Sequence, residues 1–307
     1  MELAIMIEGQ DGLTWPRWQR IATAVEDLGF VGLYRSDHYT NPNPPDKDSL
    51  ELWVSLTWLA CNTSRIEFGP MVAPLSFREP TMMTRMASAI DDLSGGRLIY
   101  GVGAGWQERE HTNYGFDLLD IPARFDRFEE GLEVITRLLK HDEPATFSGT
   151  YYQLNEATLL PRPQRPGGPP ILIGGNGPKR TLPLVAKYAD EWNAVFRTAE
   201  QFAELNDRLN ALISQEGRQP GDIRRSLMTL CIFGEDTASL SANLAKQGRT
   251  VDQLQDSPII HGVPNQIVDQ IGVLADLGVE RVLLQWMDQD DMDGLEKLAE
   301  KVMSQLQ

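Results

Sequence analysis

The sequence predicts an α/β protein of the (β/α)8 barrel (TIM barrel) class, with insertions in the loops that follow the strands. Short apolar runs alternate with amphipathic helical segments about eight times, the pattern of a parallel sheet covered by helices. The chain has 307 residues, and barrels of this class often run to about 250 residues or more as one domain. A doubly wound open sheet usually has fewer strands, so the closed barrel is favoured.

The first unit illustrates how each element is predicted. An apolar run at 3–7 reads as a strand, and residues 15–28 follow with Trp18, Ile21 and Val25 at helical spacing. Gly29 then ends the helix as a C-cap residue. The later strands are predicted at 30–34, 66–72, 98–102, 171–173, 191–195, 227–233 and 279–285. The later helices are predicted at 52–61, 81–93, 122–140, 179–188, 199–215, 264–277 and from 291 onward.

Composition and charge restrict the class of partner. The chain is 41% hydrophobic and 23% charged, which is ordinary for a globular protein and excludes disorder as an overall description. Its formal net charge of −16 disfavours nucleic acid and anionic membrane surfaces as partners. Residues 1–8 lack the basic start of a signal peptide, and no apolar run approaches the roughly 20 residues that span a bilayer. We therefore expect a soluble cytoplasmic protein.

Cysteine and histidine usage argues against metal and thiol chemistry. Cys61 and Cys231 lie far apart in apolar stretches, so we expect small buried residues in a reducing compartment. The four histidines form no His-x-His or His-Glu-x-x-His pattern, and we predict no metal site. The proline-rich segment 161–170 is compatible with a linker or with an extended loop that leads into a strand. We interpret residues 1–307 as one barrel domain.

Because barrel active sites lie at the carboxyl ends of the strands, residues at those ends are the functional candidates. Asp37 and His38 follow the second strand. An imidazole held beside a carboxylate can carry or donate a proton near neutral pH. A structural hydrogen bond in a surface loop explains the pair equally well.

Three further strand ends carry candidates. One of them is Gly103, Ala104 and Gly105, which precede Trp106. The glycines would let a flat ligand approach the backbone beside the indole ring of Trp106. A tight turn is the usual explanation of such a motif. Met71, Val72 and Ala73 could form one wall of a ring pocket, but barrel core is the simpler interpretation.

The loop from 174 to 181 has the composition of a phosphate cradle. Glycines lead into a predicted helix that opens with cations, which the helix dipole disfavours unless an anion is bound there. We favour a cradle over a glycine turn with two solvated cations. Its residues are Gly174, Gly175, Asn176, Gly177, Lys179, Arg180 and Thr181.

The order of motifs closely resembles the luciferase-like monooxygenase family, specifically its branch of coenzyme F420-dependent oxidoreductases. The resemblance covers about residues 2–196 and is weaker in the final third. Its motifs are Gly-Ala-Gly-Trp-Gln-Glu-Arg-Glu-His at 103–111, Tyr-Gly-Phe at 114–116, Arg-Phe-Asp-Arg-Phe-Glu-Glu at 124–130, Phe-Ser-Gly-Thr-Tyr-Tyr at 147–152, Pro-Pro-Ile-Leu-Ile-Gly-Gly at 169–175 and Ala-Asp-Glu-Trp-Asn at 189–193.

This resemblance implies a barrel with a flavin-type ring at its mouth, which accepts or donates a hydride. It implies that Asp37 and His38 meet the ring, with His38 often catalytic. It also implies a bulge at Met71–Val72 (or Ala73), often with a non-proline cis peptide, against one ring face. The glycine turn at 103–105 and the cradle at 174–181 agree with the interpretation from the residues alone, and the family is usually homodimeric.

One departure from the family affects the substrate. Glucose-6-phosphate dehydrogenases of this family carry a proton-donating Glu directly after their Gly-x-Gly, where this chain has Trp106. Oxidation of a sugar phosphate is therefore disfavoured, and Trp106 becomes a wall or lid over the ring. Glu108 and Glu110 lie nearby, and we interpret Glu110 as a structural partner of Arg109 or a neighbouring helix. The proton donor is unassigned.

Three hypotheses follow for the function. The first is an oxidoreductase that transfers a hydride between bound coenzyme F420 and a small organic substrate. The second is an FMN-dependent monooxygenase, which would share the cradle. The third, from another class, is a barrel that binds a flavin without catalysis. The fold alone does not separate them.

Overall fold

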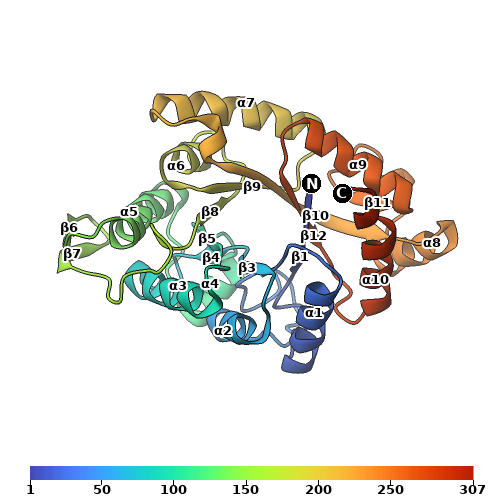
Figure 1. Cartoon of the computed structure of the whole chain (residues 1–307), viewed down its shortest axis with the longest axis horizontal. Helices are drawn as coiled ribbons and strands as arrows, with labels where there is room; N and C mark the ends of the chain where they lie inside the picture. Colours follow the sequence, from blue (N-terminus) through green and yellow to red (C-terminus); the bar gives the residue numbers. More distant parts are fainter. Residues whose placement is uncertain (307) are drawn as a thin grey trace.

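Parallel strands form a nearly closed barrel with helices around its outside, as Figure 1 shows for the computed structural model, which describes residues 1–306. The predicted (β/α)8 class is confirmed. The barrel strands are β1 (Glu2–Ile7), β2 (Gly32–Arg35), β3 (Glu67–Pro70), β4 (Ala73–Pro74), β5 (Tyr100–Gly103), β8 (Ile171–Gly174), β9 (Glu191–Val195), β10 (Arg224–Phe233) and β12 (Arg281–Gln285).

The sheet runs in the order β3-β2-β1-β12-β10-β9-β8-β5-β4, and its neighbouring strands are parallel. The first and last barrel strands lie side by side, with Ile5 opposite Leu284. A parallel bridge pairs Phe68 of β3 with Leu98, which lies just before β5, and so nearly completes the barrel. All strand carboxyl ends therefore meet at one mouth.

Helices cover the strands, and each buries an apolar stripe against the sheet. In α1 this stripe is Trp18, Ile21, Ala22 and Val25, the periodicity that the sequence predicted, and Gly29 follows the helix with a positive φ of 91°. The outer helices are α1 (Trp15–Asp27), α2 (Leu52–Asn62), α3 (Pro80–Ser94), α5 (Ile121–Lys140), α6 (Thr181–Tyr188), α7 (Ala199–Gln215), α9 (Pro264–Asp276) and α10 (Met292–Lys301).

Insertions lengthen two of the units, as predicted for the class. After β5, the short helix α4 (Glu108–Tyr114) precedes α5, and a hairpin of β6 (Ala145–Ser148) and β7 (Gln153–Ala157) projects beside α5 in Figure 1. After β10, α8 (Thr237–Lys246) and β11 (Ile260–Gly262) precede α9. The proline-rich segment 161–170 is a loop that leads into β8 and contains a turn closed by the Gly168 N–H bond to the Arg165 carbonyl at 2.9 Å.

The predicted strand at 66–72 is interrupted. β3 stops at Pro70, the Met71–Val72 peptide is cis, and the chain resumes as β4. The backbones around this break approach closely, because a Cβ on Gly69 would lie 2.0 Å from the Ile99 carbonyl oxygen and one on Gly101 would lie 2.0 Å from that of Pro70. Glycine is therefore required at both positions.

Two sequence predictions need correction at the level of elements. The helix expected from 179 begins at Thr181, so Lys179 and Arg180 precede it and are exposed. Cys61, expected to be buried, is exposed on α2, because this helix is apolar on nearly every side and only one side faces the sheet. Cys231 is buried as predicted.

Three apolar clusters are buried in the described residues, and the third, which includes Leu240 and Leu244, packs α8 against β10. A large core lies between strands and helices, whereas Ala4, Met6, Met71, Met228 and other inward residues fill the lumen. In residues 1–306, no helix combines the length and apolar character that crossing a membrane requires.

Candidate active site

A cavity of about 620 Å³ opens at the carboxyl ends of the strands. Of the residues singled out in the sequence, those lining it are His38, Met71, Val72, Gly103, Ala104, Gly105, Trp106, Gly174, Gly175, Asn176 and Thr181. Five others lie outside its lining: Asp37, Ala73, Gly177, Lys179 and Arg180. The fold therefore gathers four strand-end segments, distant in sequence, around one space.

His38 pairs with Glu110. Its Nδ1 lies 2.8 Å from Glu110 Oε1, and the backbone N–H of Tyr39 donates to Glu110 Oε2 at 2.9 Å. Glu110 is buried on α4, whose first turn faces the loop after β2. The interpretation of Glu110 as a partner of Arg109 is wrong, since Arg109 pairs with Asp46 instead.

This pairing sets the charge state of His38. Burial by itself would lower the pKa of His38, but the hydrogen bond and charge of Glu110, with smaller contributions from Glu8 and Asp37, raise it above the ordinary value. Within the described residues, Nε2 has no hydrogen-bond partner. The His38 ring also meets Trp106 edge to face, with centroids 5.5 Å apart. His38 therefore presents a ring nitrogen that readily holds a proton.

Asp37 does not pair with His38. Its carboxylate pairs with Arg78 at 2.5 Å, and both Asp37 and the neighbouring Arg35 are buried. Burial raises the pKa of Asp37, while Arg78 and Arg35 oppose that rise. The predicted imidazole–carboxylate pair thus exists, but Glu110 provides its carboxylate.

Helix α4 also fixes the loop that carries His38. Gln107 Nε2 donates to the carbonyl of Thr40 at 2.9 Å, and Arg109 Nη1 donates to the carbonyl of Asn41 at 2.8 Å. Together with Glu110, these contacts join the loops that follow β2 and β5 into one unit. The orientation of His38 is consequently set by α4.

Val72 forms one wall of the cavity, with the cis peptide that the resemblance implied. A Cβ on Gly103 would lie 2.6 Å from Val72 Cγ2, and one on Gly174 would lie 3.2 Å from Val72 Cγ1. Gly103 therefore makes room for Val72, and because it also lines the cavity, approach of a ligand to its backbone stays a prediction.

The predicted cradle lies between β8 and α6. Gly177 leaves Thr181 uncovered, since a Cβ there would lie 2.7 Å from Thr181 Oγ1. Asn176 uses its amide on the backbone of Val195, donating at 2.8 Å and accepting at 3.0 Å, so it positions the loop. Arg180 extends over the ring of Phe125, with 5.9 Å to its centroid. In the first turn of α6, the Leu182 N–H donates to the Gly177 carbonyl at 3.0 Å and Pro183 has no N–H, so Thr181 is the residue of this turn that could donate to an anion.

Asn193 lies at the floor of the cavity with an acceptor that no described residue satisfies. Its Nδ2 donates to Ser226 Oγ at 3.0 Å, and that hydroxyl donates onward to the Trp192 carbonyl at 3.2 Å. This chain of bonds fixes the amide orientation and leaves Oδ1 without a partner, although the side chain is fully buried. A ligand N–H or O–H donor would satisfy it.

Glu8 is a site residue that the sequence analysis did not identify. It follows β1 and lines the cavity, accepting from Gln285 Nε2 at 2.6 Å and from Gln10 Nε2 at 2.9 Å. Its position directly after the first strand was the available signal. Among residues 1–306, no cluster of three or more histidine, cysteine, aspartate or glutamate side chains is arranged to hold a metal ion.

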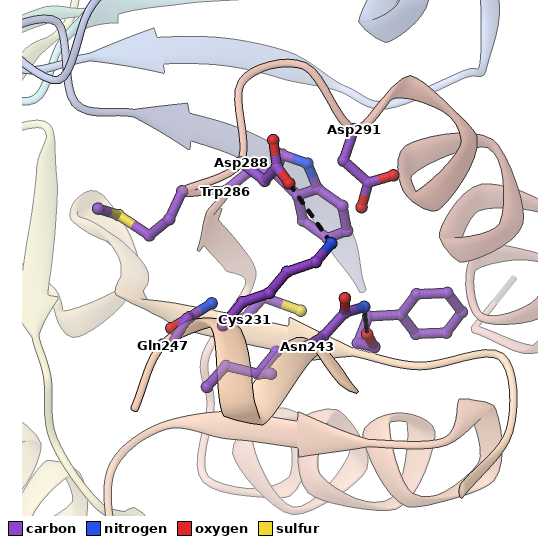
Figure 2. Close-up of a pocket in the computed structure, with 10 residues that line it drawn as sticks. Cys231, Asn243, Gln247, Trp286, Asp288 and Asp291 are labelled. Atoms are coloured by element: carbon purple, nitrogen blue, oxygen red, sulfur yellow. Dashed lines mark hydrogen bonds and ion pairs between the residues drawn. The ribbon is translucent and has the colours of Figure 1, made fainter. Parts of the chain in front are cut away.

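A second hollow of about 290 Å³ lies between α8 and the β12–α10 loop (Figure 2). Asn243 on α8 and Gln247 directly after that helix approach it from one side, and Asp288 and Asp291 from the opposite side. Cys231 lines it, but burial raises the pKa of its thiol to about 12, so it stays protonated and unreactive. None of the predicted site residues lies here.

The chain belongs to the luciferase-like monooxygenase family, whose profile matches residues 4–251. It is 26% identical over 277 residues to an F420-dependent glucose-6-phosphate dehydrogenase of Kineococcus radiotolerans, covering 88% of this chain and 78% of that one. It is 29% identical over 223 residues to an F420-dependent hydroxymycolic acid dehydrogenase of Mycobacterium tuberculosis, covering 72% of this chain and 60% of that one.

Solved structures share the fold. An F420-dependent secondary alcohol dehydrogenase in complex with an F420-acetone adduct has a TM-score of 0.85 at 17% identity, covering 99% of this chain and 98% of that one. The F420-dependent tetrahydromethanopterin reductase of Methanopyrus kandleri has a TM-score of 0.81 at 20% identity, covering 100% and 99%. A long-chain alkane monooxygenase has a TM-score of 0.82 at 16% identity, covering 100% and 91%. These identities establish the fold alone.

Proposed function

We propose that the protein is an oxidoreductase that transfers a hydride between bound coenzyme F420 and a small organic substrate. The observation that carries the proposal is the His38–Glu110 pair beside the Val72 wall, in a cavity at the barrel mouth of a family member. Named F420-dependent relatives support this cofactor. FMN is the alternative, because one phosphate cradle serves both molecules.

The residues present fit a flavin-type ring. Val72 offers a smooth apolar wall, and the Asn193 Oδ1 acceptor at the floor suits a ring N–H. Thr181 and the start of α6 lie where a phosphate would be held, with Lys179 and Arg180 beside them. When bound, such a ring accepts or releases a hydride, the step that no side chain of this cavity supplies.

The chain itself provides binding, orientation and proton handling. Glu110 accepts from His38 Nδ1 and so directs Nε2 toward the cavity, where it can exchange a proton with a substrate oxygen. The raised pKa of His38 favours its protonated form. Trp106 packs edge to face against the His38 ring at the edge of the cavity. We therefore assign His38 as the catalytic acid–base group and Glu110 as its positioning residue.

His38→Ala tests this assignment. We expect it to lower the single-turnover rate of hydride transfer by about a hundredfold or more, with a much smaller effect on cofactor affinity. Stopped-flow absorbance measures the rate, and equilibrium titration measures the affinity. Equal rates in the two proteins would remove His38 from the mechanism. Cofactor binding without turnover of any donor or acceptor would favour the non-catalytic barrel.

We also propose that the chain forms one domain and acts in the cytoplasm.

We further propose that it pairs as a homodimer through α2 and α3. No residue of α2, from Leu52 to Asn62, carries a charge, and Val54 on that helix is 56% exposed. Met82 and Leu93 on the adjacent α3 are 56% and 54% exposed. A second copy of the protein packed on this side of α2 and α3 would cover these exposed apolar residues. Val54→Glu should shift the protein to monomers in sedimentation experiments, whereas Val273→Glu on α9 should not.

A further inference from the structure

We infer that the cavity takes an uncharged, largely apolar substrate whose one oxygen function is directed at His38. This inference rests on the proposed function, because it concerns the part of the cavity that lies above the ring. Three features of the described residues carry it: the charges that line the cavity, the polarity around Glu8 and the apolar outer wall.

The cavity offers no free cation to a phosphate or carboxylate. Among residues 1–306, Arg124 is the one lysine or arginine that lines it. Its Nε, Nη1 and Nη2 donate to the carbonyls of Leu118, Gly105 and Leu119 at 3.1, 3.2 and 3.0 Å. Arg124 therefore holds the turn that carries Trp106. Its guanidinium nitrogens already donate to backbone carbonyls and are not free to bind a substrate anion.

The charge that remains in the cavity disfavours an anion. Glu8 accepts hydrogen bonds from two glutamines, and no cation is paired with it among the described residues. When His38 is protonated, its charge is balanced by Glu110 at 2.8 Å. An anionic substrate would thus lose its hydration and meet a carboxylate, whereas a hydroxyl or carbonyl would lose little.

The outer wall is apolar and open to solvent. Trp106 and Ile121 line the cavity and are 60% and 59% exposed. Phe125 and Phe196 continue this surface inward. Large exposed apolar side chains that gather at one mouth usually mark a surface that a ligand covers. A substrate with an alkyl or aryl body would bury them.

A homologous series of 2-alkanones tests the inference by isothermal titration calorimetry. We expect affinity to rise about fourfold with each added methylene until the chain reaches the mouth, the increment for burial of one methylene. Alkyl phosphates of the same length should bind more weakly than the ketones. The titrations use the Lys179→Ala, Arg180→Ala protein, so that anions held at the cradle do not contribute.

Matched variants locate the effect. Ile121→Ser should weaken binding of the long ketones, whereas Leu160→Ser should not, since Leu160 is 58% exposed and lies outside the cavity lining. An affinity independent of chain length, tighter binding of the phosphates, or equal effects of the two variants would overturn the inference.

The same samples separate this inference from the proposed function. Coenzyme F420 is titrated separately into the wild-type protein, whose Lys179 and Arg180 are intact. Failure to bind any deazaflavin or flavin would count against the proposed function, while the ketone series would still report on the cavity. Cofactor binding together with ketone affinities that do not change with chain length would leave the proposed function standing and refute the substrate class.

Discussion

At the scale of single residues, the site depends on a contact between His38 and Glu110, which are 72 positions apart in sequence. The sequence identified His38 correctly as a cavity residue but assigned it the wrong carboxylate. Asp37 pairs with Arg78, while the neighbouring His38 faces the cavity. Although Asp37 and His38 are adjacent in the sequence, their side chains bind different partners.

Glu110→Gln should lower the pKa of His38, because the variant loses the charge that offsets burial. NMR titration of the four imidazoles measures this shift directly. In the wild type, His38 should titrate above the ordinary value and His111 below it, since burial lowers the pKa of His111. Glu108→Gln, an exposed change on the same helix, is the control. An unchanged His38 pKa in Glu110→Gln would contradict the account.

The same pair contributes to stability in a defined pH window. A histidine whose pKa is raised on folding stabilises the native state fully below its unfolded pKa of about 6.5. That contribution is lost as the pH rises through the raised pKa of His38. The difference in unfolding free energy between wild type and Glu110→Gln should therefore shrink as the solution becomes alkaline.

At the scale of elements, apolar periodicity predicted the barrel strands and outer helices because each buries one regular stripe or face. It did not predict α4, which is seven residues long and polar in most positions. Nor did it predict the interruption between β3 and β4, because Met71 and Val72 read as ordinary strand residues. Both features shape the site through contacts with other elements, which periodicity does not report.

The glycine in β5 provides a test of the Val72 wall. Gly103→Ala places a Cβ 2.6 Å from Val72 Cγ2, so Val72 must move. We expect a loss of about 1–3 kcal/mol in unfolding free energy, typical of overpacking, together with weaker cofactor binding. Chemical denaturation and titration measure the two effects.

Gly272→Ala is the matched control, because a Cβ at Gly272 in α9 meets nothing within 4 Å. It should stabilise the protein by about 0.5–1 kcal/mol, as expected for alanine in a helix. A Gly103→Ala protein as stable as this control, with unchanged cofactor affinity, would show that Val72 does not define the wall.

At the scale of the whole molecule, an ionic cluster closes the end of the barrel opposite the cavity. The buried Arg281 on β12 bonds to the Tyr34 hydroxyl at 2.6 Å and pairs with Glu2, Glu67 and Glu191. These partners come from β1, β2, β3 and β9, so one guanidinium links four other strands of the barrel to β12. The members of this cluster are distant in sequence and follow no motif, so sequence patterns do not predict it.

Arg281→Met should destabilise the fold by about 3–5 kcal/mol, because the buried Glu191 loses its nearer cation, at 3.4 Å, and is left with Arg224 at 3.9 Å. Burial already raises the pKa of Glu191, and loss of Arg281 removes an opposing influence. A carboxyl with a raised pKa binds its proton more tightly in the native state, so the deficit should diminish as the pH falls. Adding Glu191→Gln should recover part of the loss at neutral pH. A deficit that grows with acidity would contradict this.

The most direct test of the central claim is equilibrium titration of the purified protein with coenzyme F420 and with FMN, side by side. We predict micromolar or tighter binding of the deazaflavin, weakened more than tenfold, or about 1.4 kcal/mol, by Lys179→Ala with Arg180→Ala. Lys246→Ala with Arg249→Ala, which removes the same charge elsewhere, should leave affinity unchanged. Selective binding of FMN would favour the monooxygenase, and binding of neither molecule would contradict the proposed function.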